Sequence, residues 1–196
     1  MIDAELKSII HDLVNKFTAI LHINLFADSV RRVITSRYDK GLDELGAKFD
    51  MNFIRDSKKI NFLESYTFDN IKGMNDELAE RLRKELSQGL LNLESIEQLK
   101  ERVKKVMSVT AERARMIART EANRAENVGR LDAARQSGLD LVKQWSAHID
   151  KRTSQVCKDL NGKIVPLNAK FKWRGEEFEA PPAHVNCRST LLFLQK

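Results

Sequence analysis

The side chains best suited to chemistry lie in the last quarter of the 196-residue chain. Cys157 is followed 27 residues later by His184-x-x-Cys187. A thiolate and an imidazole three positions apart on a tight turn can bind one metal ion, and zinc accepts cysteine and histidine ligands. A closed structural zinc site has four ligands. The sequence offers Asp150 or His148 as the fourth ligand, or a water molecule in an open site.

The same three side chains have two other interpretations. Cys157 and Cys187 are small enough to be buried apolar groups of a sheet, with His184 bound to a backbone carbonyl. The second interpretation is a disulfide between the two cysteines. The N-terminal sequence MIDAELKSIIHDLV lacks the basic start and the cleavage site of a secretory signal, so a reducing compartment is expected. We therefore expect no cofactor, with zinc as the alternative.

The composition indicates a soluble globular protein with a basic surface. The chain has 34 Lys and Arg against 28 Asp and Glu, a net charge of +6 and a pI near 9.3. Such a charge attracts nucleic acid or an acidic partner, but the opposite charges are interleaved, which favours only non-specific DNA contact. No apolar run approaches the roughly 20 residues of a membrane span, so no membrane partner is expected.

Helices are predicted for most of the first two thirds of the chain, from apolar residues at three- and four-residue spacing. The expected helices cover residues 3–24, 28–45, 75–89, 95–107 and 110–136. Residues 50–66 are less regular and are expected to form a connector with a short helix or extended piece. We divide the chain into a helical arm or bundle over residues 1–107 and an α+β module over residues 108–196.

Glu121 lies on the apolar side of the last predicted helix. At 100° per residue it shares one stripe with Thr110, Ala114, Ala118, Ala125 and Val128. A buried carboxylate needs a partner or a raised pKa, and the nearest candidate cations are Arg119 and Arg188. We expect a structural ion pair that joins helix to sheet, with a catalytic carboxylate as the alternative.

The residues after Gly138 predict a small antiparallel sheet packed on the long helix. Expected features are a strand within 139–149, a polar turn over 150–154, hairpins at Asn161-Gly162 and Arg174-Gly175, and a last strand over 189–194. Pro181 and Pro182 are expected to stiffen the loop that carries His184. The predicted fold class is therefore α+β, a helical N-terminal part followed by a long helix on a small C-terminal sheet.

Four ordered motifs in this region resemble the phage head morphogenesis family, the minor head proteins typified by protein F of phage Mu. The matching stretches are IARTE at 117–121, WSAHIDKRT at 145–153, CKDLNG at 157–162 and PPAHVNCR at 181–188. The resemblance extends over residues 68–194. Many family members carry further cysteines where this chain has Ser154 and Ser189, whereas Asp150, Arg152 and Arg188 are retained.

The resemblance implies a non-enzymatic minor capsid protein. Such a protein would join the procapsid during head assembly through the portal protein and would travel inside the virion head beside the packaged DNA. It also implies that Asp150, Arg152 and Arg188 form an ion-paired and hydrogen-bonded core, which replaces or accompanies metal. Two other functions stay open from the residues: a metal-assisted nuclease or toxin-like domain using His148, Asp150, His184 and the cysteines, and a nucleic-acid-binding module.

Overall fold

The computed structural model describes residues 23–92, 94 and 96–196. The chain divides into two compact units. Among the described residues, the first unit takes those up to Val30 and Tyr66–Arg115, and the second takes Arg31–Ser65 and Met116–Lys196. The predicted first helix falls almost wholly outside the described residues. The predicted boundary between residues 107 and 108 stays a prediction.

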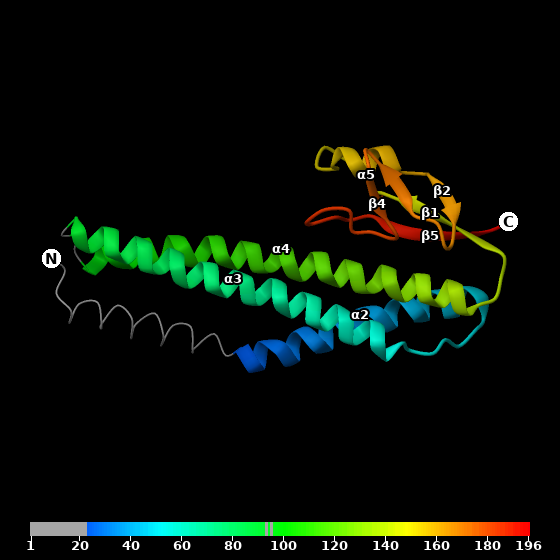
Figure 1. The fold of residues 1–196 in the computed structure, drawn as a ribbon, viewed down its shortest axis with the longest axis horizontal. Helices are drawn as coiled ribbons and strands as arrows, with labels where there is room; N and C mark the ends of the chain where they lie inside the picture. The colour runs from blue at the N-terminus through cyan, green and yellow to red at the C-terminus, as the bar shows by residue number, and fades with distance from the viewer. Residues whose placement is uncertain (1–22, 93, 95) are drawn as a thin grey trace. The chain divides into compact units, whose positions relative to one another are not determined.

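Three long helices, α2 (Ile23–Phe49), α3 (Ser57–Leu91) and α4 (Ile96–Gln136), precede the first strand in the described chain (Figure 1). These helices are fewer and longer than those predicted for the same residues. The helices expected at 95–107 and 110–136 are one, because no Gly or Pro lies at the junction between them and the Ser108 hydroxyl bonds back to the Lys105 carbonyl at 2.9 Å. This local bond lets a weak helix former stay within the helix.

The prediction of a connector over residues 50–66 is wrong for its second half, which belongs to a long helix. Helix α3 begins at Ser57, since the Asp56 carboxylate accepts hydrogen bonds from the backbone amides of Lys58 and Lys59 at 2.9 and 3.2 Å. An aspartate in this position satisfies amides that the first helical turn leaves open. Helix α2 ends where Asp50 adopts a φ of 53°, a left-handed conformation typical of the residue after a helix.

The first unit is held by apolar contacts and by ion pairs, among them those of Arg102. Leu78 and Leu82 of α3 pack against Val106 of α4. Arg102 binds Glu94 and Glu85, with nitrogen to oxygen distances of 2.6 Å. These contacts account for the pairing of α3 with α4 in this unit.

In the second unit, α2 and α4 approach each other backbone to backbone. A Cβ placed on Gly129 would lie 2.1 Å from the Tyr38 carbonyl oxygen, and one placed on Gly41 would lie 2.2 Å from the Glu126 carbonyl oxygen. Only residues without a side chain fit at this crossing. The crossing buries Ile34 and Tyr38, two positions of the apolar face predicted for α2.

The second unit also contains two antiparallel sheets. Strands β1 (Leu141–Ser146), β2 (Ile164–Pro166) and β5 (Thr190–Gln195) form one sheet in the order β2-β1-β5, and β3 (Phe171–Trp173) pairs with β4 (Glu176–Phe178). The turn between β3 and β4 is the predicted one: Arg174 and Gly175 both have positive φ, 48° and 87°. The α+β fold class is confirmed.

The hairpin predicted at Asn161-Gly162 is wrong. A six-residue helix, α5 (Gln155–Leu160), precedes these residues, and the turn connects this helix to β2. The Gly162 amide donates to the Trp145 carbonyl at 2.8 Å, which fixes the turn against β1. A segment of six residues is too short for apolar periodicity to predict a helix.

The core of the C-terminal part centres on Trp145. Its side chain is fully buried and contacts the rings of Phe171 and Phe178 edge-on, with centroids 5.2 and 6.2 Å apart. Lys143, on the same face of β1, is also fully buried and donates to the Glu179 carbonyl at 2.8 Å. Burial lowers the pKa of Lys143 to about 8. A lysine therefore belongs to the core beneath the sheet.

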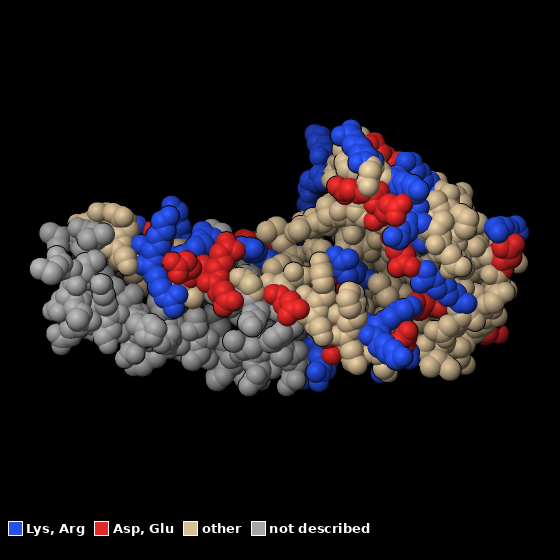
Figure 2. Space-filling view, in the orientation of Figure 1, with Lys and Arg blue, Asp and Glu red and all other residues tan. Residues whose placement is uncertain are grey.

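Charges of both signs are distributed over the face drawn in Figure 2, in keeping with the interleaving read from the sequence. Within the described ranges, none of the helices combines the length and the apolar composition that a membrane crossing requires.

Candidate metal centre

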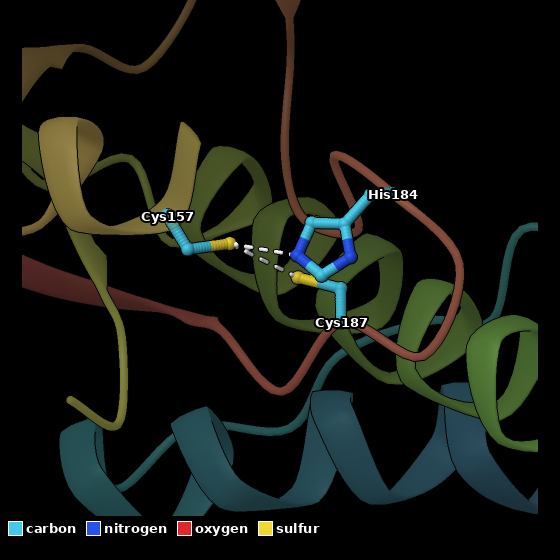
Figure 3. Close-up of side chains that lie close together, drawn as sticks. All are labelled: Cys157, His184 and Cys187. Carbon is cyan, nitrogen blue, oxygen red and sulfur yellow. Dashed lines mark hydrogen bonds between the residues drawn. The ribbon is translucent and has the colours of Figure 1, made fainter. Parts of the chain in front are cut away.

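The structure brings together the three side chains whose spacing suggested a metal site. Cys157 comes from α5, and His184 and Cys187 come from the loop before β5 (Figure 3). The two Sγ atoms are 3.6 Å apart, and the Cys157 Sγ lies 3.2 Å from the His184 Nε2. The three ligand atoms all lie within 4.8 Å of one another.

The orientation of the His184 ring is determined by its other nitrogen. Nδ1 lies 2.8 Å from the Val185 carbonyl oxygen, which can only accept a hydrogen bond, so Nδ1 carries the proton. Nε2 then presents its lone pair to the Cys157 Sγ and to the Ser154 Oγ, 2.7 Å away. Metal-binding histidines in proteins are oriented by the same kind of bond.

The two distances from the Cys157 sulfur are close to those around a tetrahedral ion. With zinc about 2.3 Å from sulfur and about 2.0 Å from nitrogen, two sulfurs would be about 3.8 Å apart and a sulfur and a nitrogen about 3.5 Å apart. The observed 3.6 and 3.2 Å are slightly shorter than these distances. A small adjustment of side chains would therefore accommodate the ion.

The two cysteines differ in their affinity for a proton. The hydrogen bond from Cys157 lowers the pKa of Cys187 to about 5, despite burial. The same bond, together with burial, raises the pKa of Cys157. Cys187 is therefore the cysteine that loses its proton more readily. Thiolates are the metal-binding form of cysteine.

Asp150, predicted as the fourth ligand, lies outside the group of three. The Arg188 guanidinium binds both its carboxylate oxygens, at 2.8 and 2.6 Å, and the Arg152 backbone amide donates to Oδ1 at 2.8 Å. His148 is 3.9 Å from this carboxylate. The group that stands next to the His184 Nε2 is instead the Ser154 hydroxyl.

The ion pair of Asp150 and Arg188 predicts a specific pH dependence. Arg188 holds the pKa of the Asp150 carboxyl well below its usual range. The stabilisation is therefore complete above the unfolded pKa of about 4 and is lost as pH falls through the folded value. We expect the difference in melting temperature between the protein and Arg188→Gln to be constant from pH 7 to 5 and to shrink below about pH 4.

Thermal unfolding monitored by circular dichroism between pH 2 and 7 measures this difference. Asp140→Asn, which alters an exposed pair with Lys196, is the control and should show a much smaller change with pH. A difference for Arg188→Gln that stays unchanged down to pH 2 would show that the ion pair does not stabilise the fold.

Glu121 is buried, with 4% of its surface exposed, as its place on the predicted stripe indicated. Its partner differs from the prediction. The carboxylate is bound by Arg124 Nε at 2.8 Å, one helical turn further on. Within the described part of the chain no ion pair joins it to Arg119, which is exposed, and Arg188 is bound to Asp150.

The predicted stripe of α4 is correct only in part. Ala125 is fully buried and Val128 half-buried, but Ala118 is exposed. The side chains of Thr110 and Ala114 lie outside the described residues.

A row of polar side chains on α4, which the sequence reasoning missed, holds the loop before β5. Thr120 Oγ1 accepts from the Asn186 amide at 2.8 Å, and Asn123 Nδ2 donates to the Cys187 carbonyl at 3.0 Å. Asn127 Oδ1 accepts from the Leu191 amide at 2.9 Å. The spacing T-x-x-N-x-x-x-N places all three on one face of a helix, and this was the available signal.

Asn127→Ala tests this attachment. The side chain is fully buried, so its loss leaves the Leu191 amide without its acceptor and should lower the free energy of unfolding by about 2 kcal/mol. Urea unfolding measures the change. Gln155→Ala, which removes an exposed amide bonded to Asp159, is the control and should change stability by less than about 0.5 kcal/mol. Equal losses in the two variants would argue against the role of Asn127.

Comparison with known proteins identifies the family. The family model described as Phage Mu protein F like protein matches residues 80–192, which is more than half of the chain and includes the whole site. The chain belongs to this family. The resemblance noted in the motifs is thereby confirmed.

Two curated relatives are similar to this Mu F-like chain. It is 32% identical over 127 residues to Minor head protein GP7 of Bacillus phage SPP1. It is 30% identical over 126 residues to NAD(+)--arginine ADP-ribosyltransferase EFV of Enterococcus faecalis (strain ATCC 700802 / V583). Each match covers 60% of this chain, but only 41% of the first relative and 26% of the second. No solved structure matches the chain significantly.

Proposed function

We propose that this protein is a non-enzymatic phage minor head protein that enters the procapsid during assembly by binding the portal protein. The family match over residues 80–192 is the observation that carries the proposal. A relative named as a minor head protein supports it. The protein would then remain in the virion head.

The contacts within the second unit are compatible with a structural role in the head. Its charged residues are largely used within the protein: Arg130 binds Glu44 and Glu126, and Arg188 binds Asp150. The loop before β5 is attached to α4 at several backbone positions. A unit built in this way presents a defined surface to a partner. Contact with packaged DNA would be non-specific, through the net charge of +6.

Sedimentation tests the proposed assembly role. Purified protein is mixed with portal oligomers or with procapsids of the same phage and centrifuged, with the protein alone as control. We expect co-sedimentation with both, and retention of portal binding in DNase-treated samples at 0.3 M salt, because attraction to DNA is screened there. Protein that stays in the supernatant in both mixtures would reject the proposal.

We also propose that Cys157, His184 and Cys187 hold a structural zinc ion, with water or the Ser154 hydroxyl in the fourth position. When bound, the ion would connect α5 to the loop before β5. The test is elemental analysis of protein purified without added chelator. About one equivalent of zinc is expected, and it should be lost in Cys157→Ser and in His184→Ala, whereas His148→Ala should retain it. A zinc content that is the same in all four proteins would reject this site.

The alternative function, a metal-assisted nuclease or toxin-like domain, has less support. Such a reaction needs a free base near an activated water. Both oxygens of Asp150 are engaged by Arg188, which removes the carboxylate that was considered for this role. Incubation with DNA and RNA, with and without chelator, tests the alternative. Cleavage that chelator abolishes would favour it over the structural role.

A further inference from the structure

We propose that, when no metal occupies their site, Cys157 and Cys187 are oxidised by a small disulfide to a reversible disulfide bond, so that bound metal and disulfide are mutually exclusive states. This disulfide is separate from the proposed assembly role, and it would regulate the proposed zinc site. It uses the same three side chains, but the disulfide itself requires no metal.

The first support is the geometry of the two sulfurs. They lie 3.6 Å apart, and a disulfide requires about 2.05 Å, so the sulfurs must close by about 1.5 Å. Both cysteines are unpaired, and the chain contains no third cysteine that could compete. The two come from separate segments, α5 and the loop before β5, and Figure 3 shows both sulfurs directed into the space beside the His184 ring.

The second support is that one of the two cysteines lines a cavity and the other does not. Both side chains are buried, but Cys157 lines a small cavity with Ser154, His184 and the surface residues His148 and Arg152, whereas Cys187 does not line it. The cationic Arg152 favours an oxidant that carries carboxylates, such as a small peptide disulfide of the glutathione class. Cys157 is therefore the cysteine that reacts with the oxidant, and Cys187 is the one that completes the reaction.

The reaction is a two-step thiol–disulfide exchange. His184 Nε2, 3.2 Å from the Cys157 Sγ, takes the thiol proton, and the thiolate attacks one sulfur of the oxidant. The released small thiolate takes that proton, and Cys157 is left in a mixed disulfide. The Cys187 thiolate then attacks the Cys157 sulfur and expels the second small thiolate, which takes a proton from water. Two cysteine thiols are oxidised, and one small disulfide is reduced to two thiols.

The zinc-bound state and the disulfide state exclude each other because both bonds use the same sulfur lone pairs. A disulfide sulfur has lost the thiolate lone pair that binds zinc, so oxidation should release the ion, and bound zinc should protect both thiols.

The test uses the full chain, stripped of metal by a chelator and incubated with oxidised glutathione. We expect the free thiols, counted under denaturing conditions, to fall from two to zero per chain, with a mass loss of two hydrogens, no dimer, and recovery with dithiothreitol. Peptide mapping should identify the Cys157–Cys187 bond. Two thiols that persist, or a product linked between chains, would overturn the inference.

Three variants separate the steps. Cys187→Ser should stop at a glutathione adduct on Cys157, and Cys157→Ser should react at least tenfold more slowly, because its remaining cysteine does not line the cavity. His184→Ala should lose zinc but still form the disulfide, at a reduced rate. Equal rates of adduct formation in the two cysteine variants would contradict the assigned order.

Zinc titration separates this inference from the zinc proposal. Wild-type protein loaded with one equivalent should oxidise at least tenfold more slowly than stripped protein. Wild-type protein that binds no zinc but forms the disulfide would reject the zinc proposal alone. Protein that binds zinc yet never forms the disulfide would reject only the proposed disulfide. Equal oxidation with and without bound zinc would reject the mutual exclusion of zinc and disulfide.

Discussion

Replacing Gly129 by alanine is expected to lower the free energy of unfolding by about 3 kcal/mol, although alanine is the better helix former by about 1 kcal/mol. The added Cβ would lie 2.1 Å from the Tyr38 carbonyl oxygen and 3.0 Å from its carbon, both of them backbone atoms. Backbone atoms cannot rotate away, so α2 and α4 must separate. The separation would weaken the packing of Ile34 and Tyr38 and the 2.6 Å bond from the Tyr38 hydroxyl to Asp132.

Gly73→Ala in α3 is the matched control for this variant. Nothing lies within 4 Å of a Cβ at this position, so the helix propensity of alanine acts alone and should stabilise the protein by up to about 1 kcal/mol. Urea unfolding followed by circular dichroism measures both variants. A stabilising effect of Gly129→Ala would show that α2 and α4 do not touch at this crossing.

The second large effect is expected for Trp145→Ala, with a loss of about 3–5 kcal/mol. The indole is fully buried between Phe171 and Phe178, and its removal opens a cavity that the strands around it cannot fill. Because Trp145 pairs with Leu191 across β1 and β5, the loop that leads into β5 should loosen as well. Thiol reactivity of Cys187 should therefore rise together with the loss of stability.

Trp145→Phe separates ring packing from hydrogen bonding. The indole Nε1 is buried and has no hydrogen-bond partner within the described residues, so phenylalanine removes an unsatisfied donor while it keeps an aromatic ring. We expect a loss of less than about 2 kcal/mol. Leu192→Ala, on the exposed face of β5, should cost less than about 1 kcal/mol. A loss for Trp145→Ala no larger than that of Leu192→Ala would contradict the central role of this residue.

The helices and strands were predictable wherever a regular pattern was long enough. The apolar spacing of α2 and the Arg174-Gly175 turn between β3 and β4 needed only local information. Helix α5 was missed because six residues span less than two turns. The junction near residue 108 was predicted as a break, but without Gly or Pro nothing in the backbone prevents the helix from continuing.

The partners of the charged residues were less predictable. Glu121 was correctly expected to be buried, since helical periodicity determines which face it occupies. Its partner is Arg124 instead of Arg119, because residues three apart lie on the same side of a helix, whereas residues two apart do not. The pairing of Asp150 with Arg188 joins positions 38 apart; the family resemblance implied that both belong to one ion-paired core, whereas their spacing alone gave no such indication.

The sequence by itself determined the types and order of the functional groups: two cysteines and a histidine at metal-binding spacing, an acid on a helix face, and motifs sufficient to indicate the family. Tertiary structure alone decided which of them meet. It placed the Ser154 hydroxyl beside His184, assigned Asp150 to Arg188, and attached the loop before β5 to Thr120, Asn123 and Asn127. The physical reason is that spacing along a chain describes local geometry, whereas contacts between distant segments depend on how all the elements pack together.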